Sequence, residues 1–140
     1  MTWHPGQIAG LLAKQKETGA DLVGGSPFLA PGGLGDVPWA RRLPSLLLNA
    51  FYRGLFAHGL TAYTPIFRLY RAAILKSLPL TSEGFEINAE IAARFLRDGR
   101  TLVEAPAVLT LRKEGVSKLD RWRELRRHAR LIGALLMNPR

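Results

Sequence analysis

The feature that most constrains the fold is a strand–loop–helix pattern in the last third of the chain. An apolar, strand-like run over 102–109 leads into the polar stretch 112–119, and an arginine-rich helical pattern follows. Gly115 permits backbone angles that other residues avoid, and Ser117 can bind an oxygen or cap the next helix. We therefore expect a cationic loop over 112–118 between two ordered elements.

This loop has two interpretations, which the residues alone leave open. Arg112, Lys113 and Lys118 could neutralise phosphate oxygens, the arginine as a planar fork and the lysines as point charges. The same stretch could be a solvated turn before a capped helix.

The charge distribution indicates an anionic partner. The chain has 140 residues, a formal charge of +9 and a pI near 10.8. Between 112 and 140 there are nine Lys or Arg and three acids, so two thirds of the net charge lies in the last fifth of the sequence. Such clustering is typical of proteins that bind phospholipid, nucleic acid or a phosphorylated substrate.

Composition limits the remaining classes. The length suffices for one domain, 1–140, with a real core. The absence of cysteine excludes disulfides and thiolate chemistry. No apolar run approaches the roughly 20 residues of a membrane-spanning helix. The N-terminus lacks a signal-peptide pattern, so we expect a cytoplasmic protein.

The last helix is expected over about 118–137 and has two stripes. The apolar stripe comprises Leu119, Trp122, Leu125, Ala129, Ile132 and Leu136. The cationic stripe on its flank comprises Arg123, Arg126, Arg127 and Arg130. This pattern is typical of a helix that lies in a membrane interface, where Trp and Leu enter the acyl boundary and Arg binds the head groups. The alternative is a helix packed on its own domain with a solvated arginine edge.

The first forty residues predict a helix, a strand and a long loop. The helix begins near Pro5 and ends at Gly19, and the strand covers 20–24, an order typical of α/β folds. The Gly/Pro-rich loop over 24–38 contains Gly25 and Ser26. It is either a linker or a substrate loop at the carboxyl end of a strand, where open α/β sheets bind ligands.

A second helix opens at Trp39, and its apolar spacing predicts one buried face. The residues of that face are Leu43, Leu47, Ala50, Phe51, Gly54 and Leu55. Arg41 and Arg42 stand at its start, where the helix dipole disfavours cations. They either hold an anion between them or form a solvated pair.

The middle of the chain predicts strand-like structure over 60–71, a short helix over 71–78, a helix over 86–98 and a strand over 101–111. Glu86 and Glu90 are four residues apart and share a helix face. Paired carboxylates suit acid/base work or metal binding, although acids also favour a helix N-terminus.

Taken in order, these pieces resemble a known family. They are Asp21–Ser26, the Gly-rich loop, Arg41-Arg42 with Ser45 and Asn49, Phe67–Arg71, Gly84-Phe85 with Glu90, Val103–Pro106, and Arg112-x-x-Gly115-x-Ser117-Lys118-Leu119. They resemble the carboxyl-terminal half of family 2 glycosyltransferases of the dolichyl-phosphate mannose synthase type. The resemblance covers almost the whole chain, and its most specific piece is the Arg-x-x-Gly-x-Ser-Lys loop.

The resemblance implies the carboxyl-terminal portion of a Rossmann-like GT-A fold, α/β in class, with a basic amphipathic C-terminal helix. Such enzymes move a sugar from a nucleotide-sugar to a polyprenyl phosphate at the membrane, and they use a divalent metal, Mg or Mn. The lipid phosphate is the nucleophile, so the catalytic demand is electrostatic.

The resemblance also implies residue roles. Arg112 and Lys118 would be catalytic, in a loop that closes over the phosphates. The substrate- or phosphate-binding residues would be Gly25, Ser26, Arg41, Arg42, Ser45, Lys113, Gly115 and Ser117. Glu90 is a candidate acidic site residue. Trp122 and the four arginines of the last helix would face the cytosolic side of an anionic membrane.

Departures from the family are equally informative. Pro27 stands where the family has arginine, and 62–68 lacks the family's Asp and Gly. No Asp-x-Asp occurs, so we expect no metal ligand in this chain and a donor-binding half elsewhere. We expect a truncated or split, peripheral glycosyltransferase with little turnover alone and no nucleic-acid partner. The alternatives are a non-catalytic basic module on anionic membrane or nucleic acid, and an inactive remnant with an unpaired strand edge.

Overall fold

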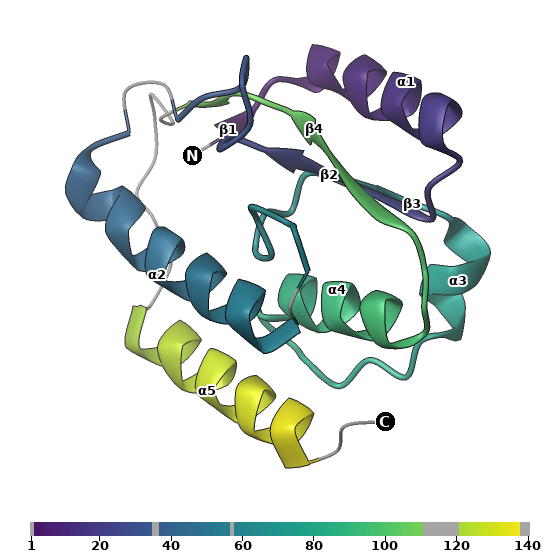
Figure 1. The fold of residues 1–140 in the computed structure, drawn as a ribbon. Coiled ribbons are helices and arrows are strands. Elements are labelled where there is room, and N and C mark those ends of the chain that lie inside the picture. Colours follow the sequence, from purple (N-terminus) through teal and green to yellow (C-terminus); the bar gives the residue numbers. More distant parts are fainter. Residues whose placement is uncertain (1, 35–36, 57, 111–120, 138–140) are drawn as a thin grey trace.

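Figure 1 shows the protein as a computed structural model. The structure describes residues 2–34, 37–56, 58–110 and 121–137. For Arg41 and Arg121 it describes only the backbone. The described elements are, in order, β1 (Thr2–Trp3), a 3-10 turn (Pro5–Gln7), α1 (Ile8–Thr18), β2 (Leu22–Ser26), α2 (Trp39–Phe56), β3 (Arg68–Tyr70), α3 (Ala72–Ser77), α4 (Ile87–Arg97), β4 (Leu102–Pro106), β5 (Leu109–Thr110) and α5 (Arg121–Met137).

The main sheet has the order β3-β2-β4. β2 and β4 are parallel, with Leu22 opposite Leu102 and Ser26 opposite Pro106, whereas β3 is antiparallel to β2. β1 and β5 form a separate antiparallel pair. The mixed α/β class is as expected, and it is consistent with part of a GT-A domain. The parallel pairing brings the carboxyl ends of β2 and β4 to the same edge.

Helices cover both faces of this sheet (Figure 1). Alternate residues of a strand point to opposite faces. Val23 and Ala105 therefore pack with Leu11 of α1, while Leu22 and Leu102 join the larger core. That larger core includes α4 and the inner sides of α2 and α5.

The helix bounds largely follow the sequence signals. α1 ends at Gly19 with φ 66°, and the turn after α4 contains Gly99 with φ 65°, both in the left-handed region that favours glycine. The stretch 60–71 differs from expectation, since only Arg68–Tyr70 forms a strand. The backbone N–H groups of 61–63 are bound by side chains of other elements, described below, rather than by a strand partner.

The predicted buried face of α2 is wrong. Of its six positions only Leu55 is partly covered, and the others are exposed. The helix instead turns Asn49 and Tyr52 inward, where Tyr52 packs against Phe56 and Tyr63. Apolar periodicity identifies an amphipathic helix, but it does not predict which part of the protein, if any, covers the apolar face.

The last helix also presents its apolar stripe to the outside. His128, Leu131 and Leu135 are the buried residues of α5, whereas Trp122 and Leu125 are exposed. The helix therefore packs on its own domain through the three buried residues and Ile132, with exposed arginines, while most of the predicted apolar stripe lies outside that contact. No helix in the part of the chain that the structure describes is both long and apolar enough to cross a membrane.

Candidate functional site

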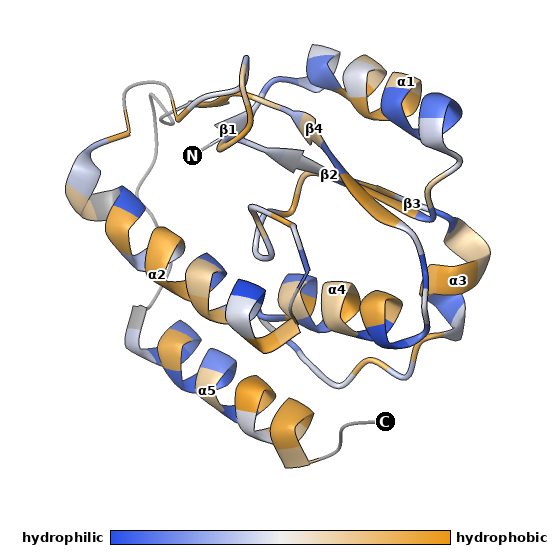
Figure 2. Ribbon diagram, viewed as in Figure 1, coloured by the Kyte–Doolittle hydropathy of each residue, from blue (hydrophilic) through white to orange (hydrophobic). Residues whose placement is uncertain are grey.

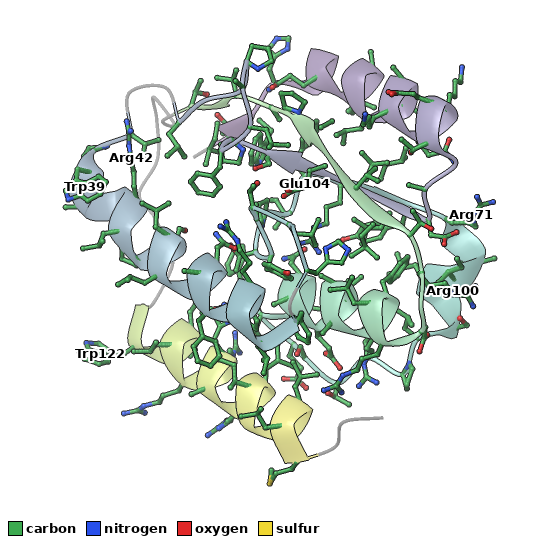
Figure 3. All side chains as sticks on the ribbon, in the orientation of Figure 1. Trp39, Arg42, Arg71, Arg100, Glu104 and Trp122 are labelled. Carbon is green, nitrogen blue, oxygen red and sulfur yellow. The ribbon has the colours of Figure 1, made fainter. Side chains whose placement is uncertain are left out.

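The candidate site lies at the carboxyl edge shared by β2 and β4. Gly24 lies opposite Glu104, and Ser26 follows at the end of β2. Figure 3 shows Glu104 in the interior, between the sheet and α2. Ligands of open α/β sheets bind outside the carboxyl ends of parallel strands, so this edge is where the chain would meet a substrate.

Glu104 fixes the segment that covers this edge. Its carboxylate accepts hydrogen bonds from Thr61 N at 2.7 Å, Thr61 Oγ1 at 2.9 Å and Ala62 N at 2.9 Å. The next N–H, of Tyr63, donates to Asn49 Oδ1 at 2.6 Å. Residues 61–63 are thus held between β4 and α2 by two side chains, in place of a strand partner.

Ser26 extends this network by a directed chain of hydrogen bonds. A carboxylate carries no proton, so Thr61 Oγ1 must donate to Glu104. Ser26 Oγ, 2.6 Å from Thr61 Oγ1, therefore donates to it. Ser26 Oγ also accepts from Phe28 N at 3.1 Å. One polar chain consequently fixes the start of the Gly/Pro-rich loop, the 61–63 segment and β4 together.

A cation lies beside this network. Arg68 donates to Asn88 O at 2.5 Å and to Tyr63 O at 2.6 Å. Burial lowers the pKa of Arg68, an effect that Tyr70 and Glu104 oppose. Burial, and secondarily the Glu104 charge, raises the pKa of Tyr63 to about 12. Tyr63 is therefore a neutral phenol at physiological pH, and Arg68 supplies the positive charge.

The described part of the Gly-rich loop, 24–34 and 37–38, is packed rather than free. A Cβ at Gly25 would lie 2.4 Å from the Phe67 ring, so only glycine fits there. Further along, Gly33 N donates to Ala107 O at 3.3 Å and Leu109 N donates to Gly33 O at 2.8 Å. These contacts argue against the linker interpretation and place the loop beside the end of β4.

The structure places only some of the predicted phosphate-binding residues. Gly25 and Ser26 lie at the edge, and Arg42 at the start of α2 donates from Nε to Val37 O at 2.6 Å. Ser45 is exposed on α2. The side chain of Arg41 and the basic loop lie outside the described residues; the loop residues concerned are Arg112, Lys113, Gly115, Ser117 and Lys118.

Glu90 is surrounded by partners from its own neighbourhood. It accepts from Thr81 N at 3.1 Å, Ser82 N at 2.8 Å and Arg94 Nη2 at 2.7 Å. Burial would raise its pKa, but the hydrogen bonds from Ser82, Arg94 and Thr81 outweigh burial and lower it. Glu86 accepts from Gly84 N at 3.2 Å, and its other oxygen is buried with no hydrogen-bond partner among the residues that the structure describes. Across the described ranges, no group of three or more His, Cys, Asp or Glu could hold a metal ion.

A second basic feature lies on α5. Trp122, Arg123, Arg126, Arg127 and Arg130 line an open depression of about 810 Å³. Arg127 pairs with Glu124 at 3.0 Å and is half-buried. Glu124 in turn accepts from Phe85 N at 3.2 Å.

The inner side of α5 is anchored by a buried pair. Tyr52 Oη lies 2.8 Å from His128 Nδ1. Burial raises the pKa of Tyr52 and lowers that of His128, although Glu86 and Glu124 oppose the latter shift. The protonated phenol therefore donates to a neutral imidazole, and this bond joins α2 to α5.

Sequence reasoning assigned no role to Thr61 or to the Glu104 network. A signal was present for Glu104, a lone acid inside an apolar strand, since a buried charge needs partners. Arg68 in an aromatic run gives the same signal. Thr61 gave none, because its role depends on a contact across 43 positions.

Comparison with characterised proteins agrees with the motif order. The chain is 32% identical over 107 residues to the polyprenol monophosphomannose synthase of Mycolicibacterium smegmatis, covering 74% of this chain and 40% of that protein. It is 30% identical over 120 residues to the undecaprenyl-phosphate mannosyltransferase of Micrococcus luteus, covering 84% and 49%. No protein-family model matches the chain. The chain spans less than half the length of these relatives. The chain is therefore homologous to family 2 glycosyltransferases of the dolichyl-phosphate mannose synthase type, over part of their length.

Proposed function

We propose that this chain is the acceptor-side half of a glycosyltransferase that moves a sugar from a nucleotide-sugar to a polyprenyl phosphate at a membrane surface. The observation that carries the proposal is its homology to two proteins named for mannosyl transfer to polyprenyl phosphates. The order of the motifs supports assignment to the carboxyl-terminal half.

The described residues provide the frame of the acceptor site. The Ser26–Thr61–Glu104 chain holds two loops at the carboxyl edge of β2 and β4. A rigid backbone at this edge keeps the reacting groups in line, which is worth several kcal/mol in a two-substrate reaction, about 7 or more in favourable cases. The acceptor phosphate would lie between this edge and the start of α2, near Arg42 and Ser45.

The chemistry of the reaction is electrostatic. An oxygen of the lipid phosphate attacks the anomeric carbon of the sugar, and the bond from that carbon to the nucleotide diphosphate breaks. The diphosphate leaves with the electron pair, so cations must stabilise both phosphate groups. We assign this role to Arg112 and Lys118. The divalent metal expected for such enzymes would stabilise the leaving diphosphate. The described residues do not fit a metal site. Because the sequence contains no Asp-x-Asp, we assign the metal ligands to the donor half.

We place the protein peripherally on the cytosolic face of an anionic membrane. The exposed Trp122 and the arginines of the α5 depression support this placement. Aromatic and cationic side chains together favour the head-group region of a bilayer.

Acceptor binding tests the proposal. A short-chain polyprenyl phosphate in micelles should bind the 140-residue chain more tightly than the matching polyprenol, which lacks the phosphate. Arg112→Ala and Lys118→Ala should remove that preference, whereas Lys16→Ala, an exposed cation on α1, should retain it. Equal binding of phosphate and alcohol would contradict the proposal.

A further inference from the structure

Two aromatic rings are stacked at the carboxyl edge of the main sheet. The rings of Trp3 and Phe67 are nearly parallel, with their centroids 5.3 Å apart and 12° between their planes. Phe67 lies against Gly25, near the carboxyl end of β2, since a Cβ added at Gly25 would be 2.4 Å from its ring. Figure 1 shows β1, which contains Trp3, at the end of the sheet toward which β2 points. The stacked pair therefore lies at the edge where open α/β sheets bind ligands.

The backbone holds both rings in this position. β1, which contains Trp3, pairs with β5. Close by, Gln7 Nε2 donates to Val108 O at 3.0 Å, and Val108 N donates to Gln7 Oε1 at 2.6 Å. Phe67 is fixed from the other side, because its carbonyl oxygen accepts from Gly25 N at 2.8 Å. An aromatic surface that is held in advance loses little conformational entropy when it binds a ligand.

Trp3 keeps accessible surface in spite of this packing. Phe67 covers one face of the indole and itself packs against the small core beneath α1, yet Trp3 remains partly exposed. The accessible part is therefore the edge of the indole or its other face. β1 is pale in Figure 2, because tryptophan and threonine lie near the middle of that hydropathy scale. The accessible surface is thus amphipathic, an aromatic ring with one N–H donor.

A sugar ring is the ligand that suits this surface best. A pyranose presents C–H groups on one face, which pack on an aromatic ring, and hydroxyl groups around its edge, which stay hydrated or bind polar groups. In the proposed reaction the sugar passes between two phosphates at this edge, where the Ser26–Thr61–Glu104 chain holds the backbone. A nucleotide base could stack on the same ring, but the proposed function assigns the nucleotide to the donor half. We therefore favour the sugar.

We propose that Trp3, supported by Phe67, forms a platform on which the transferred sugar ring stacks. The proposal deepens the proposed function and rests on it for the identity of the reaction, although binding of a sugar by Trp3 is measurable without transfer. Stacking on a fixed ring would hold the anomeric carbon in line with the attacking phosphate, which is how positioning accelerates a two-substrate reaction.

Saturation-transfer NMR tests sugar binding by the 140-residue chain. The probe is methyl α-D-mannopyranoside, because the two relatives are named for mannosyl transfer. When the aromatic protons of the protein are irradiated, the C–H groups of one face of the sugar should receive the strongest saturation. Trp3→Ala should remove the signal and Trp3→Phe should retain a weaker one. Trp39→Ala is the matched control: it removes a tryptophan of α2 that is 64% exposed, and it should leave the signal unchanged.

Two results would overturn the proposal. One is the absence of a mannoside signal, or a signal that Trp3→Ala leaves unchanged. The other is Trp3-dependent saturation of uridine or guanosine monophosphate without any of the mannoside, which would mean that the ring binds a base. Circular dichroism and urea unfolding check that each variant is folded. Trp3→Leu keeps an apolar side chain against Phe67 without a ring, and it replaces Trp3→Ala if the smaller side chain unfolds the protein.

Lipid ligands separate the platform from the proposed function. A short-chain polyprenyl phosphomannose should bind the chain about three- to tenfold more tightly than the matching polyprenyl phosphate, the gain expected of one aromatic stacking contact. Trp3→Ala should remove this gain and leave binding of the polyprenyl phosphate unchanged. Equal binding of these two lipids to the unaltered chain would overturn the proposal. Equal binding of polyprenyl phosphate and polyprenol, together with a Trp3-dependent mannoside signal, would contradict the proposed function and support the platform.

Discussion

Replacing Glu104 by alanine is the sharpest test of the network at the sheet edge. Its carboxylate accepts three hydrogen bonds, two of them from backbone N–H groups of Thr61 and Ala62. A hydrogen bond contributes about 1 kcal/mol net, and more when an acceptor is charged. Because the segment is only partly buried, water can solvate part of what is lost. We therefore expect Glu104→Ala to lower the free energy of unfolding by about 3 kcal/mol.

Such a loss is a large share of the roughly 5–15 kcal/mol that stabilises a typical domain. Urea unfolding followed by circular dichroism measures it, provided the urea dependence, the m-value, stays unchanged. Thr61→Val removes the hydroxyl but keeps its N–H, so its loss should be smaller, about 1–2 kcal/mol. The matched control is Glu83→Ala, because Glu83 is an exposed acid in the loop before α4. A Glu104→Ala loss no larger than that of Glu83→Ala would refute the reasoning.

Three further predictions concern single positions. Gly25→Ala should destabilise the protein by about 1–3 kcal/mol in the same urea assay, because the new Cβ would meet the Phe67 ring. Gly10→Ala is the control and should stabilise the protein, because Gly10 lies inside a helix with open space around its Cβ position. Burial lowers the pKa of His128 in the folded protein, so on acidification the imidazole is protonated in the unfolded chain before it is protonated in the fold. The free energy of unfolding should therefore fall as the pH drops below about 6.5. His128→Gln should flatten this part of the dependence of stability on pH, and an unchanged slope would contradict the assignment. Hydrogen bonds lower the pKa of Glu90 in the fold, so its contribution to stability is present above its ordinary pKa and is lost on acidification. Glu90→Gln should therefore lower the free energy of unfolding at neutral pH but hardly change it in strong acid. A loss that is the same at all pH values would contradict this argument.

Local signals explain what the sequence could predict of the fold. Gly19 and Gly99 mark helix ends because both positions have positive φ, and the α4 stripe of Ile91 and Phe95 is buried as its spacing indicates. The apolar runs that form β2 and β4 were also recognisable. These features depend on a few neighbouring residues, which a single sequence displays.

What the sequence could not predict depends on distant contacts. The inward side of α2 is set by Tyr52, whose hydroxyl meets His128 from α5. The irregular path of 61–63 is set by Asn49 and Glu104, which bind its N–H groups from two other elements. An aromatic, β-branched stretch therefore resembled a strand, although its backbone is satisfied by side chains.

The most direct test of the central claim is a transfer assay on a chimera. The N-terminal half of the Micrococcus luteus relative, which the proposal makes the donor-binding half, would be fused to the N-terminus of this chain. The chimera would be supplied with a nucleotide-linked mannose and undecaprenyl phosphate in vesicles. The account predicts mannosyl-phospholipid formation, abolished by Arg112→Ala or Lys118→Ala and retained in Lys16→Ala. A folded, vesicle-bound and nucleotide-binding chimera that transfers no sugar to any polyprenyl phosphate would contradict it.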